Sequence, residues 1–287
     1  MLSSRVLKPK PHYNHCIFSI KNIFQEIQAL NRRLFIQVSR RLISIFSGII
    51  QPLLWLILFG ALFNNIPMDI FNKSIKYTRF LSAGIIVFTA FTAGLNAGLP
   101  IIFDREFGFF NRLLTSPLNS RFSIFFASTY FIIIISLLQI GCILLFSEFL
   151  GSHIPNIQAL IVIINIIFII TIGITLISIA LAFLLPGHIQ LLALILVISL
   201  PLLFSSTALA PLSIMPHWLQ IVASFNPLTY AIEVIRYVYF IENFNLITPV
   251  IDTIWGKLSL RDIFLNLIQL DIAIIVIVYQ FLTKKFK

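Results

Sequence analysis

A run of 84 residues, from Phe149 to Ile232, contains no Asp, Glu, Lys or Arg. About 20 apolar helical residues cross a hydrocarbon core roughly 30 Å thick, so this run has room for more than one crossing. Only 10% of the whole chain is charged, whereas ordinary soluble domains carry about 25%. These observations exclude a soluble domain and predict an integral membrane protein.

Six apolar stretches, separated by polar residues and helix breakers, are long enough to cross a membrane as helices. Barrel strands would be about 10 alternating residues each, and the apolar stretches show no such alternation. The expected fold class is therefore all-α. An N-terminal segment, residues 1–41, is expected to precede a membrane domain over residues 42–283, with spans at about residues 42–63, 80–103, 122–147, 157–185, 189–210 and 263–282.

The basic residues are unequally shared between the two sides that six spans create. Eight Lys or Arg precede the first span, three lie between the second and third spans, and three follow the sixth. Loops rich in Lys and Arg stay on the cytoplasmic side, so both termini are expected there. The net charge of +10 is therefore interpreted as a topology signal, and no nucleic-acid partner is expected.

Residues 19–41 form a predicted amphipathic helix before the first span. Its apolar residues recur every three or four positions, and its basic and amide residues fall on the other face. A basic helix of this kind lies in the membrane interface, although a targeting presequence is an alternative. The apolar positions are Ile20, Ile23, Phe24, Ile27, Leu30, Leu34 and Val38.

The loop between the second and third spans, residues 102–117, interleaves charged and aromatic residues. This pattern predicts a short helix with one polar and one apolar face, which Pro117 would end. The apolar face could lie in the membrane interface or bind a soluble partner. Periodicity leaves both possibilities open.

The connection after the fifth span, residues 211–262, is unusually apolar for a loop. Its Trp and Tyr residues are typical of a membrane interface, and its helical pattern places Glu233 and Arg236 at i,i+3, away from the apolar face. The segment is expected to lie on the bilayer or to dip into it.

Few residues are candidates for chemistry inside the membrane. Ionisable groups within spans are functional candidates by default, and here Asp271 in the sixth span is the main one; a solvated helix end is the alternative. Gly256 and Lys257 lack the earlier glycine of a phosphate-binding loop, so no ATPase activity, catalytic residue or cofactor is expected. The cluster of His12, His15 and Cys16 is interpreted as a polar tail, not as a metal site.

Two motifs carry a family resemblance. The sequence from Phe103 to Gly108 (FDREFG), followed by Leu113 to Pro117 (LLTSP), resembles the motif between spans two and three of type-2 ATP-binding-cassette (ABC) permeases. The sequence Ala208–Pro211, Met215–Gln220 and Asn226–Tyr230, followed by Arg236, is similar to the second hallmark of that family. The likeness extends over about residues 20–283 in span number, loop lengths and motif order.

The resemblance implies the membrane half of an ABC exporter of the daunorubicin-resistance type, which moves an apolar or amphipathic substrate outward. It implies an elbow helix at residues 19–41, a coupling helix at residues 104–116 and external re-entrant helices. The implied partners are two copies of an ABC ATPase subunit, a second permease copy and membrane lipid. The implied coupling residues are Asp104, Arg105, Glu106, Gly108, Arg112, Leu113, Leu114, Ser116 and Pro117, and the re-entrant residues are Pro216, Trp218, Asn226, Pro227, Tyr230 and Arg236.

The excess of Ile, Phe and Asn suggests an A+T-rich gene, and the chain resembles the plastid-encoded permeases of red algae. That resemblance implies a plastid membrane with both termini in the stroma; a bacterial inner membrane is the alternative. Two other functions stay open. The first is a secondary, ion-coupled transporter that would use Asp271, and the second is a membrane assembly factor for cytochrome maturation.

Overall fold

The structure is a computed structural model that describes residues 20–63, 68–70, 73–75, 77–115, 122–149, 155–241, 244–254 and 256–285. Three sequence predictions therefore lie outside the described residues. These are the coupling residues Ser116 and Pro117, and the interpretation of the N-terminal cluster that contains His12, His15 and Cys16.

The described part of the chain is helical, apart from two short antiparallel hairpins. The first half contains α1 (Ile20–Ser39), α2 (Leu42–Leu62), hairpin β1 (Met68–Ile70) and β2 (Lys73–Ile75), α3 (Tyr77–Leu95), α4 (Gly98–Glu106), α5 (Phe109–Thr115) and α6 (Phe122–Phe149). The second half contains α7 (Ile157–Leu184), α8 (His188–Phe204), a 3-10 turn (Leu212–Ile214), α9 (His217–Phe225), α10 (Pro227–Phe240), hairpin β3 (Pro249–Thr253) and β4 (Gly256–Ser259), and α11 (Leu260–Lys285).

Five helical segments of the described chain are long and apolar enough to cross a membrane, and α8 is a shorter apolar helix. The fold is that of an all-α polytopic membrane protein, as predicted. The expected fifth span, residues 189–210, is too long, because α8 ends at Phe204 and residues 205–208 form a turn. The side chain of Asn226 binds the end of α8: its Nδ2 donates to the Leu202 carbonyl, 2.8 Å away.

The second span is interrupted at Asn96 and Ala97, so that α3 and α4 replace the single expected helix. Ser178 of α7 explains the interruption. Its hydroxyl accepts a hydrogen bond from the Gly98 amide, at 2.9 Å, and donates one to the Leu95 carbonyl. The Ser178 side chain thus satisfies backbone groups at the break that would otherwise be unpaired in an apolar interior.

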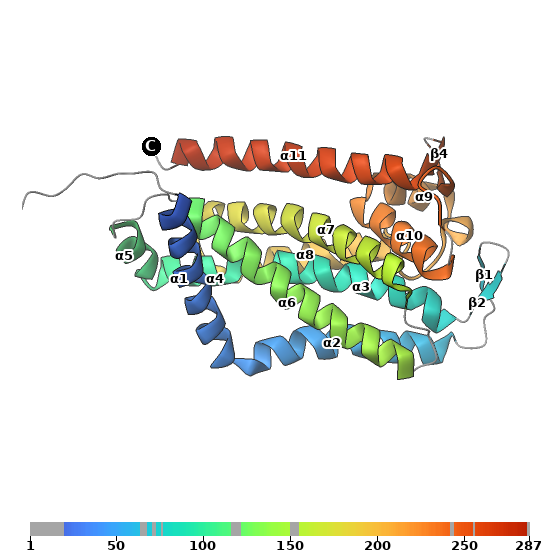
Figure 1. Cartoon of the computed structure of the whole chain (residues 1–287), viewed down its shortest axis with the longest axis horizontal. Coiled ribbons are helices and arrows are strands. Elements are labelled where there is room, and N and C mark those ends of the chain that lie inside the picture. Colours follow the sequence, from blue (N-terminus) through green and yellow to red (C-terminus); the bar gives the residue numbers. More distant parts are fainter. Residues whose placement is uncertain are drawn as a thin grey trace, which may run out of the picture.

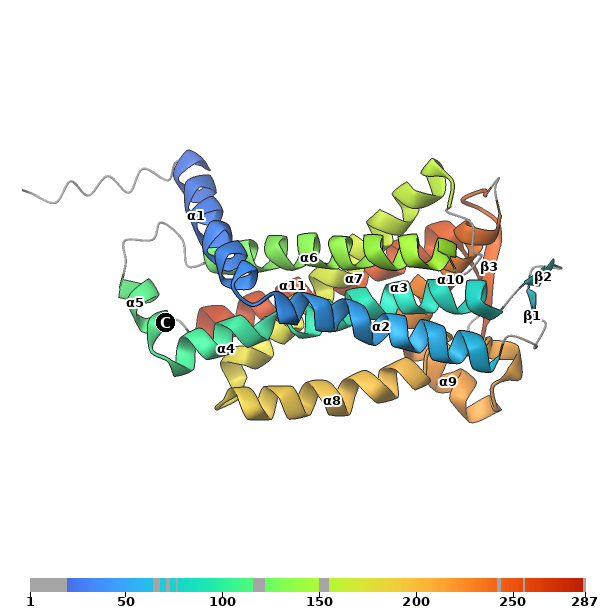
Figure 2. The same cartoon turned by 90° about the horizontal axis from the view of Figure 1, so that it is seen from below.

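Helix α3 forms the centre of the bundle and packs against α2, α6, α7 and α10. In the most apolar 18-residue stretch of the α3–α4 segment 72% of the residues are buried, compared with 17% in the corresponding stretches of α2 and of α11. Figures 1 and 2 show that α2, α8 and α11 lie at the periphery. Their outer faces carry large apolar side chains, which is the arrangement expected of helices that face lipid.

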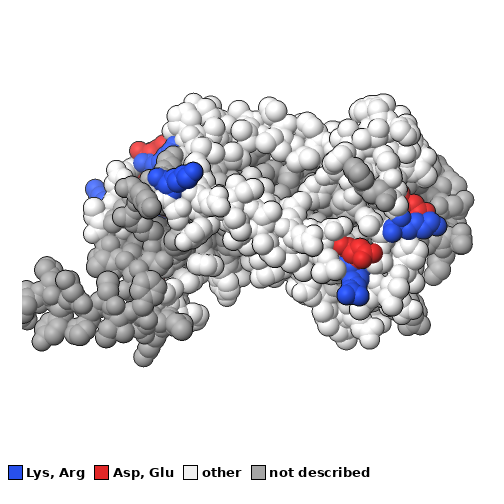
Figure 3. All heavy atoms as spheres, turned by 90° about the horizontal axis from the view of Figure 1, so that it is seen from above, with Lys and Arg blue, Asp and Glu red and all other residues white. Residues whose placement is uncertain are grey.

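The two ends of the bundle differ in structure. Figure 1 shows α1, α5, the end of α4 and the end of α11 together at one end. Helices α9 and α10 lie at the other end with both hairpins. On the face shown in Figure 3, charged side chains lie toward the two ends, and the middle is uncharged. An apolar middle between polar ends matches a bundle that spans a bilayer.

Candidate functional site

Asp104, Arg105 and Glu106 close the C-terminal end of α4, and each binds a different neighbouring element. Asp104 binds α1: the Nη2 atom of Arg33 lies 2.5 Å from Oδ1 and 2.6 Å from Oδ2 of the Asp104 carboxylate. The Arg33 guanidinium also lies over the Phe109 ring, 3.9 Å from its centroid. Helix α1 is therefore held to the end of α4 and to the start of α5.

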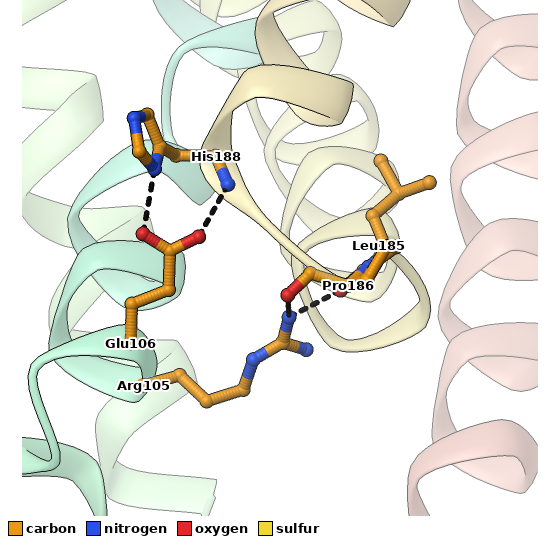
Figure 4. A network of polar contacts seen from close by, with 5 residues as sticks. All are labelled: Arg105, Glu106, Leu185, Pro186 and His188. Atoms are coloured by element: carbon orange, nitrogen blue, oxygen red, sulfur yellow. Dashed lines mark hydrogen bonds and ion pairs between the residues drawn. The ribbon is translucent and has the colours of Figure 1, made fainter.

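Arg105 binds the C-terminal end of α7 (Figure 4). Its guanidinium donates to the carbonyls of Ala182 (2.9 Å), Phe183 (3.3 Å) and Pro186 (2.8 Å), and also to that of Leu185. The last carbonyls of a helix lack partners within the helix and carry partial negative charge. Arg105 satisfies them and places a positive charge where the helix dipole favours one.

Glu106 binds the N-terminal end of α8. Its Oε1 accepts from the His188 backbone amide, and its Oε2 lies beside the Nδ1 atom of the same residue, both at 2.6 Å (Figure 4). A carboxylate is favourable at this end of a helix. Gly187 allows the approach, because an added Cβ there would lie 2.8 Å from Oε1. The sequence predicted the break between the fourth and fifth spans at residues 186–188, but not that this turn binds Arg105 and Glu106.

The expected single coupling helix over residues 104–116 is wrong. The three charged residues belong to α4, and a turn at Phe107 and Gly108 separates them from α5. Gly108 has φ of +72°, a conformation that L side chains rarely adopt. This glycine therefore allows the turn between the two helices.

Helix α5 presents both a buried and an exposed surface. The Phe110 ring packs into the bundle against Phe183, with ring centroids 5.3 Å apart, and Leu113 is half-buried. Phe107, in the preceding turn, is 81% exposed, and Arg112 is also exposed. Residues 107–115 thus pack on the bundle through Phe110 and expose an aromatic and a cationic side chain. Exposed side chains of these types are suited to contact with a soluble partner.

At the opposite end, Arg236 of α10 is only 1% exposed. It pairs with Glu233, donates to the Thr207 carbonyl at 2.8 Å, and lies over the Phe80 ring, 3.6 Å from the centroid. Burial lowers the pKa of the Arg236 guanidinium, while the neighbouring Glu233 carboxylate opposes this change. Helix α10 is buried on nearly all sides by protein, so it does not lie exposed on a bilayer surface; that this segment dips into the bilayer stays a prediction.

Asn226 joins the start of α10 to the end of α8. Its Oδ1 accepts from the Leu228 amide at 3.0 Å, as an N-cap, and Pro227 occupies the first helical position. Its Nδ2 donates to the Leu202 carbonyl and, at 3.1 Å, to the Ser205 hydroxyl.

The remaining predicted residues near α9 and α10 differ in burial. Tyr230 donates to the Ser224 carbonyl at 2.5 Å, and burial raises the pKa of its phenol. Pro216 immediately precedes α9. Trp218, in contrast, is 66% exposed and suits the membrane interface.

Asp271 lies away from both of these ends, on the face of α11 that packs against α7. Its Oδ1 occupies the space next to Gly173, where no side chain could be added without displacing the carboxylate. Asp271 is half-buried. The alternative of a solvated helix end therefore does not describe its surroundings, since the carboxylate points at a neighbouring helix.

Five long apolar helices with polar connections at both ends of the bundle define a polytopic membrane protein. A family profile described as "ABC-2 type transporter" matches residues 25–240. The chain belongs to the ABC-2 type transporter family, and it is the non-catalytic permease component of such a transporter. Permeases of this family function with ABC ATPase subunits.

Three relatives support the same assignment, and each is named "Putative transport permease ycf38". The relative from Porphyra purpurea is 55% identical over 250 residues, which are 87% of this chain and 86% of the relative. That from Pyropia yezoensis is 50% identical over 286 residues (99% and 98%), and that from Cyanophora paradoxa 59% over 215 residues (75% and 74%). The predicted family and the predicted resemblance to plastid-encoded algal permeases are confirmed.

Proposed function

We propose that this permease exports an apolar or amphipathic substrate, using the energy of a separate ATPase that binds at α5. The observation that carries the proposal is the junction of Asp104, Arg105 and Glu106 at the base of α5. Asp104, Arg105 and Glu106 bind α1, the end of α7 and the start of α8, respectively. A movement of α5 would therefore displace these three helices together. A coupling site requires such a connection between a docking surface and the spanning helices.

The proposed complex contains two permease copies and two ATPase subunits. Closure of the ATPases would move both α5 segments and rock the two bundles between inward-open and outward-open states, which differ in their contacts with substrate. The described part of the apolar middle contains few charges, so a strongly ionic substrate would lack partners there.

The proposed topology has six crossings, with α8 as the fifth. The ends of α4 and α11 and the whole of α5 then face the side that contains the ATPase. The plastid-encoded relatives support a plastid membrane, with this side facing the stroma.

Site-directed crosslinking tests the proposed docking surface. Asn111 on α5 is exposed. In full-length protein that lacks Cys16 and Cys142, the Asn111→Cys variant is expected to crosslink to a co-purifying ATP-binding subunit. An Ile247→Cys variant is the matched control, because Ile247 is 84% exposed and lies in the connection between α10 and β3, two elements at the opposite end of the bundle. Recovery of no ATP-binding subunit, or equal crosslinking from both positions, would contradict the proposal.

A further inference from the structure

The interruption of the second span is a turn of 3-10 type inside a long helix. The amides of Ala97 and Leu99 each donate to the carbonyl three residues back, at 3.1 Å, where an α-helix would use the carbonyl four residues back. The Gly98 amide and the Leu95 carbonyl bond the Ser178 hydroxyl of α7. A 3-10 stretch in the middle of a helix often marks a hinge.

Pro100 is a second cause of this interruption. Proline has no amide hydrogen to donate, and its ring clashes with the carbonyl four residues back, which here belongs to Asn96. A proline alone does not break a span in this protein, because α2 contains Pro52 and stays helical. Pro100 and the Ser178 hydroxyl together therefore account for the break.

The helices on the two sides of the break are held differently. Helix α3 packs against α2, α6, α7 and α10, and nearly all of its residues are buried. In α4, three of the nine residues are buried. The contacts of α4 with α7 include Gly98, where a Cβ would lie 2.5 Å from the Ser178 carbonyl oxygen, and the Arg105 guanidinium. Helix α3 is therefore the fixed side of the break, and α4 is the side that can turn.

A cavity of about 390 Å³ lies beside α4 and gives it room to turn. Leu99, Pro100 and Phe103 of α4 line this cavity, together with residues of α1, α2, α3 and α6. At 3.6 residues per turn, these three side chains lie on the face of α4 roughly opposite Gly98 and Arg105. Helix α4 thus has α7 on one face and the cavity on the other.

We propose that the break is the hinge of the coupling movement: α4 turns about residues 96–98 toward the cavity and carries α5 with it, while α3 stays in place. The Ser178 hydroxyl positions the hinge, because a hydroxyl can rotate and keep both of its partners as their angle changes. A rotation of about 20° would move the end of α4, about 15 Å from the break, by about 5 Å. That an ATPase drives this movement rests on the proposed function; the flexibility of the break does not.

Pulsed electron paramagnetic resonance tests the hinge by measuring the distance between two spin labels. One label is placed at Thr115→Cys, at the exposed end of α5, and the other at Ile161→Cys, on the exposed surface of α7 about 25 Å before Ser178. The full-length chain lacks Cys16 and Cys142, and it is co-expressed with an excess of Cys-free chain so that distances between copies do not contribute. In lipid nanodiscs, with the subunits that co-purify, ATP with Mg²⁺ and vanadate is expected to shift this distance by about 5 Å.

A Pro100→Ala/Ser178→Ala protein tests whether the movement uses the break. Ala at position 100 supplies the missing amide, and loss of the hydroxyl returns its main-chain partners to the helix, so a continuous span is expected to lose the shift. Pro52→Ala/Ser136→Ala is the matched control and should keep the shift, since these residues lie within α2 and α6. Pro100→Ala alone removes no hydrogen bond, so it tests the hinge if the double variant fails to fold; its shift should be about half that of the parent protein.

An undiminished shift in the Pro100 and Ser178 variants, or no shift in the parent protein with the ATP-binding subunit bound, would overturn the inference. The distances measured without nucleotide judge the hinge independently of the ATPase. Their distribution should be about twofold broader in the parent protein than in the double variant, and equal widths would also overturn the inference. Recovery of no ATP-binding subunit would contradict the proposed function, and the two widths would then decide whether the break is a hinge.

Discussion

The Arg33 guanidinium holds both carboxylate oxygens of Asp104, although 71 residues separate the two in sequence. Arg33 lies on α1 and Asp104 at the end of the second span. Partly exposed ion pairs of good geometry contribute about 1 kcal/mol. We expect Arg33→Gln and Asp104→Asn each to lower the temperature at which the solubilised protein loses its monodisperse peak.

A double substitution separates the pair from general effects of charge. The Arg33→Gln/Asp104→Asn protein should be no less stable than either single variant, because both remove the same interaction. Arg32→Gln is the control, since Arg32 is the exposed neighbour on the same helix. Additive losses from the two single substitutions would show that the residues act independently.

The Arg105→Lys substitution is expected to destabilise the C-terminal end of α7. The planar guanidinium reaches several carbonyls at the end of α7, whereas a Lys ammonium is a single compact charge. In Arg105→Lys we expect faster amide hydrogen exchange around residues 183–190, with little change in α3. Arg112→Lys, on the exposed face of α5, should exchange like the wild-type protein. Unchanged exchange in Arg105→Lys would mean that α7 ends stably without this cap.

The protein should lose more stability when one partner of the buried pair Glu233–Arg236 is removed than when both are removed. Removing one partner of a buried pair costs about 3–5 kcal/mol, because the other charge is left uncompensated. Arg236→Met/Glu233→Leu should therefore yield more monodisperse protein after detergent extraction than Glu233→Leu alone. The opposite order would indicate that each side chain has a separate essential role.

Asn226 should not be replaceable by Asp, even though both residues are good N-caps. Asp can accept from the Leu228 amide but cannot donate to the Leu202 carbonyl. We expect Asn226→Asp to be destabilised by about 1 kcal/mol, as measured by heat-induced loss of monodisperse protein. Full stability of this variant would show that the contact with the end of α8 contributes little.

Transport by an Asp271→Asn variant distinguishes the proposed exporter from a secondary transporter. If ATP supplies the energy, Asp271→Asn should retain ATP-dependent transport in proteoliposomes that contain the ATPase subunit. Asn fits the same space beside Gly173, so packing is preserved. Abolished transport, with ATPase binding intact, would favour an ion-coupled mechanism instead.

The spans and the family motifs could be predicted from sequence, because hydropathy and motif order are local properties of the chain. The break at Asn96 and Ala97 could not, since it depends on Ser178, a residue that reaches it only after α7 has packed. The burial of Arg236 was missed for a similar reason: its partners Thr207 and Phe80 come from other segments. Gly108 was recognised as part of a motif, but its positive φ was not predicted.

Side chains of the two family motifs form hydrogen bonds with both ends of helix α8. Glu106, from the first motif, holds its N-terminus, and Asn226, from the second, holds its C-terminus. The helix has 17 residues, which makes it about 25 Å long. It therefore links the end of α4, at one end of the bundle, to the start of α10, at the other, along the periphery and not through the buried α3.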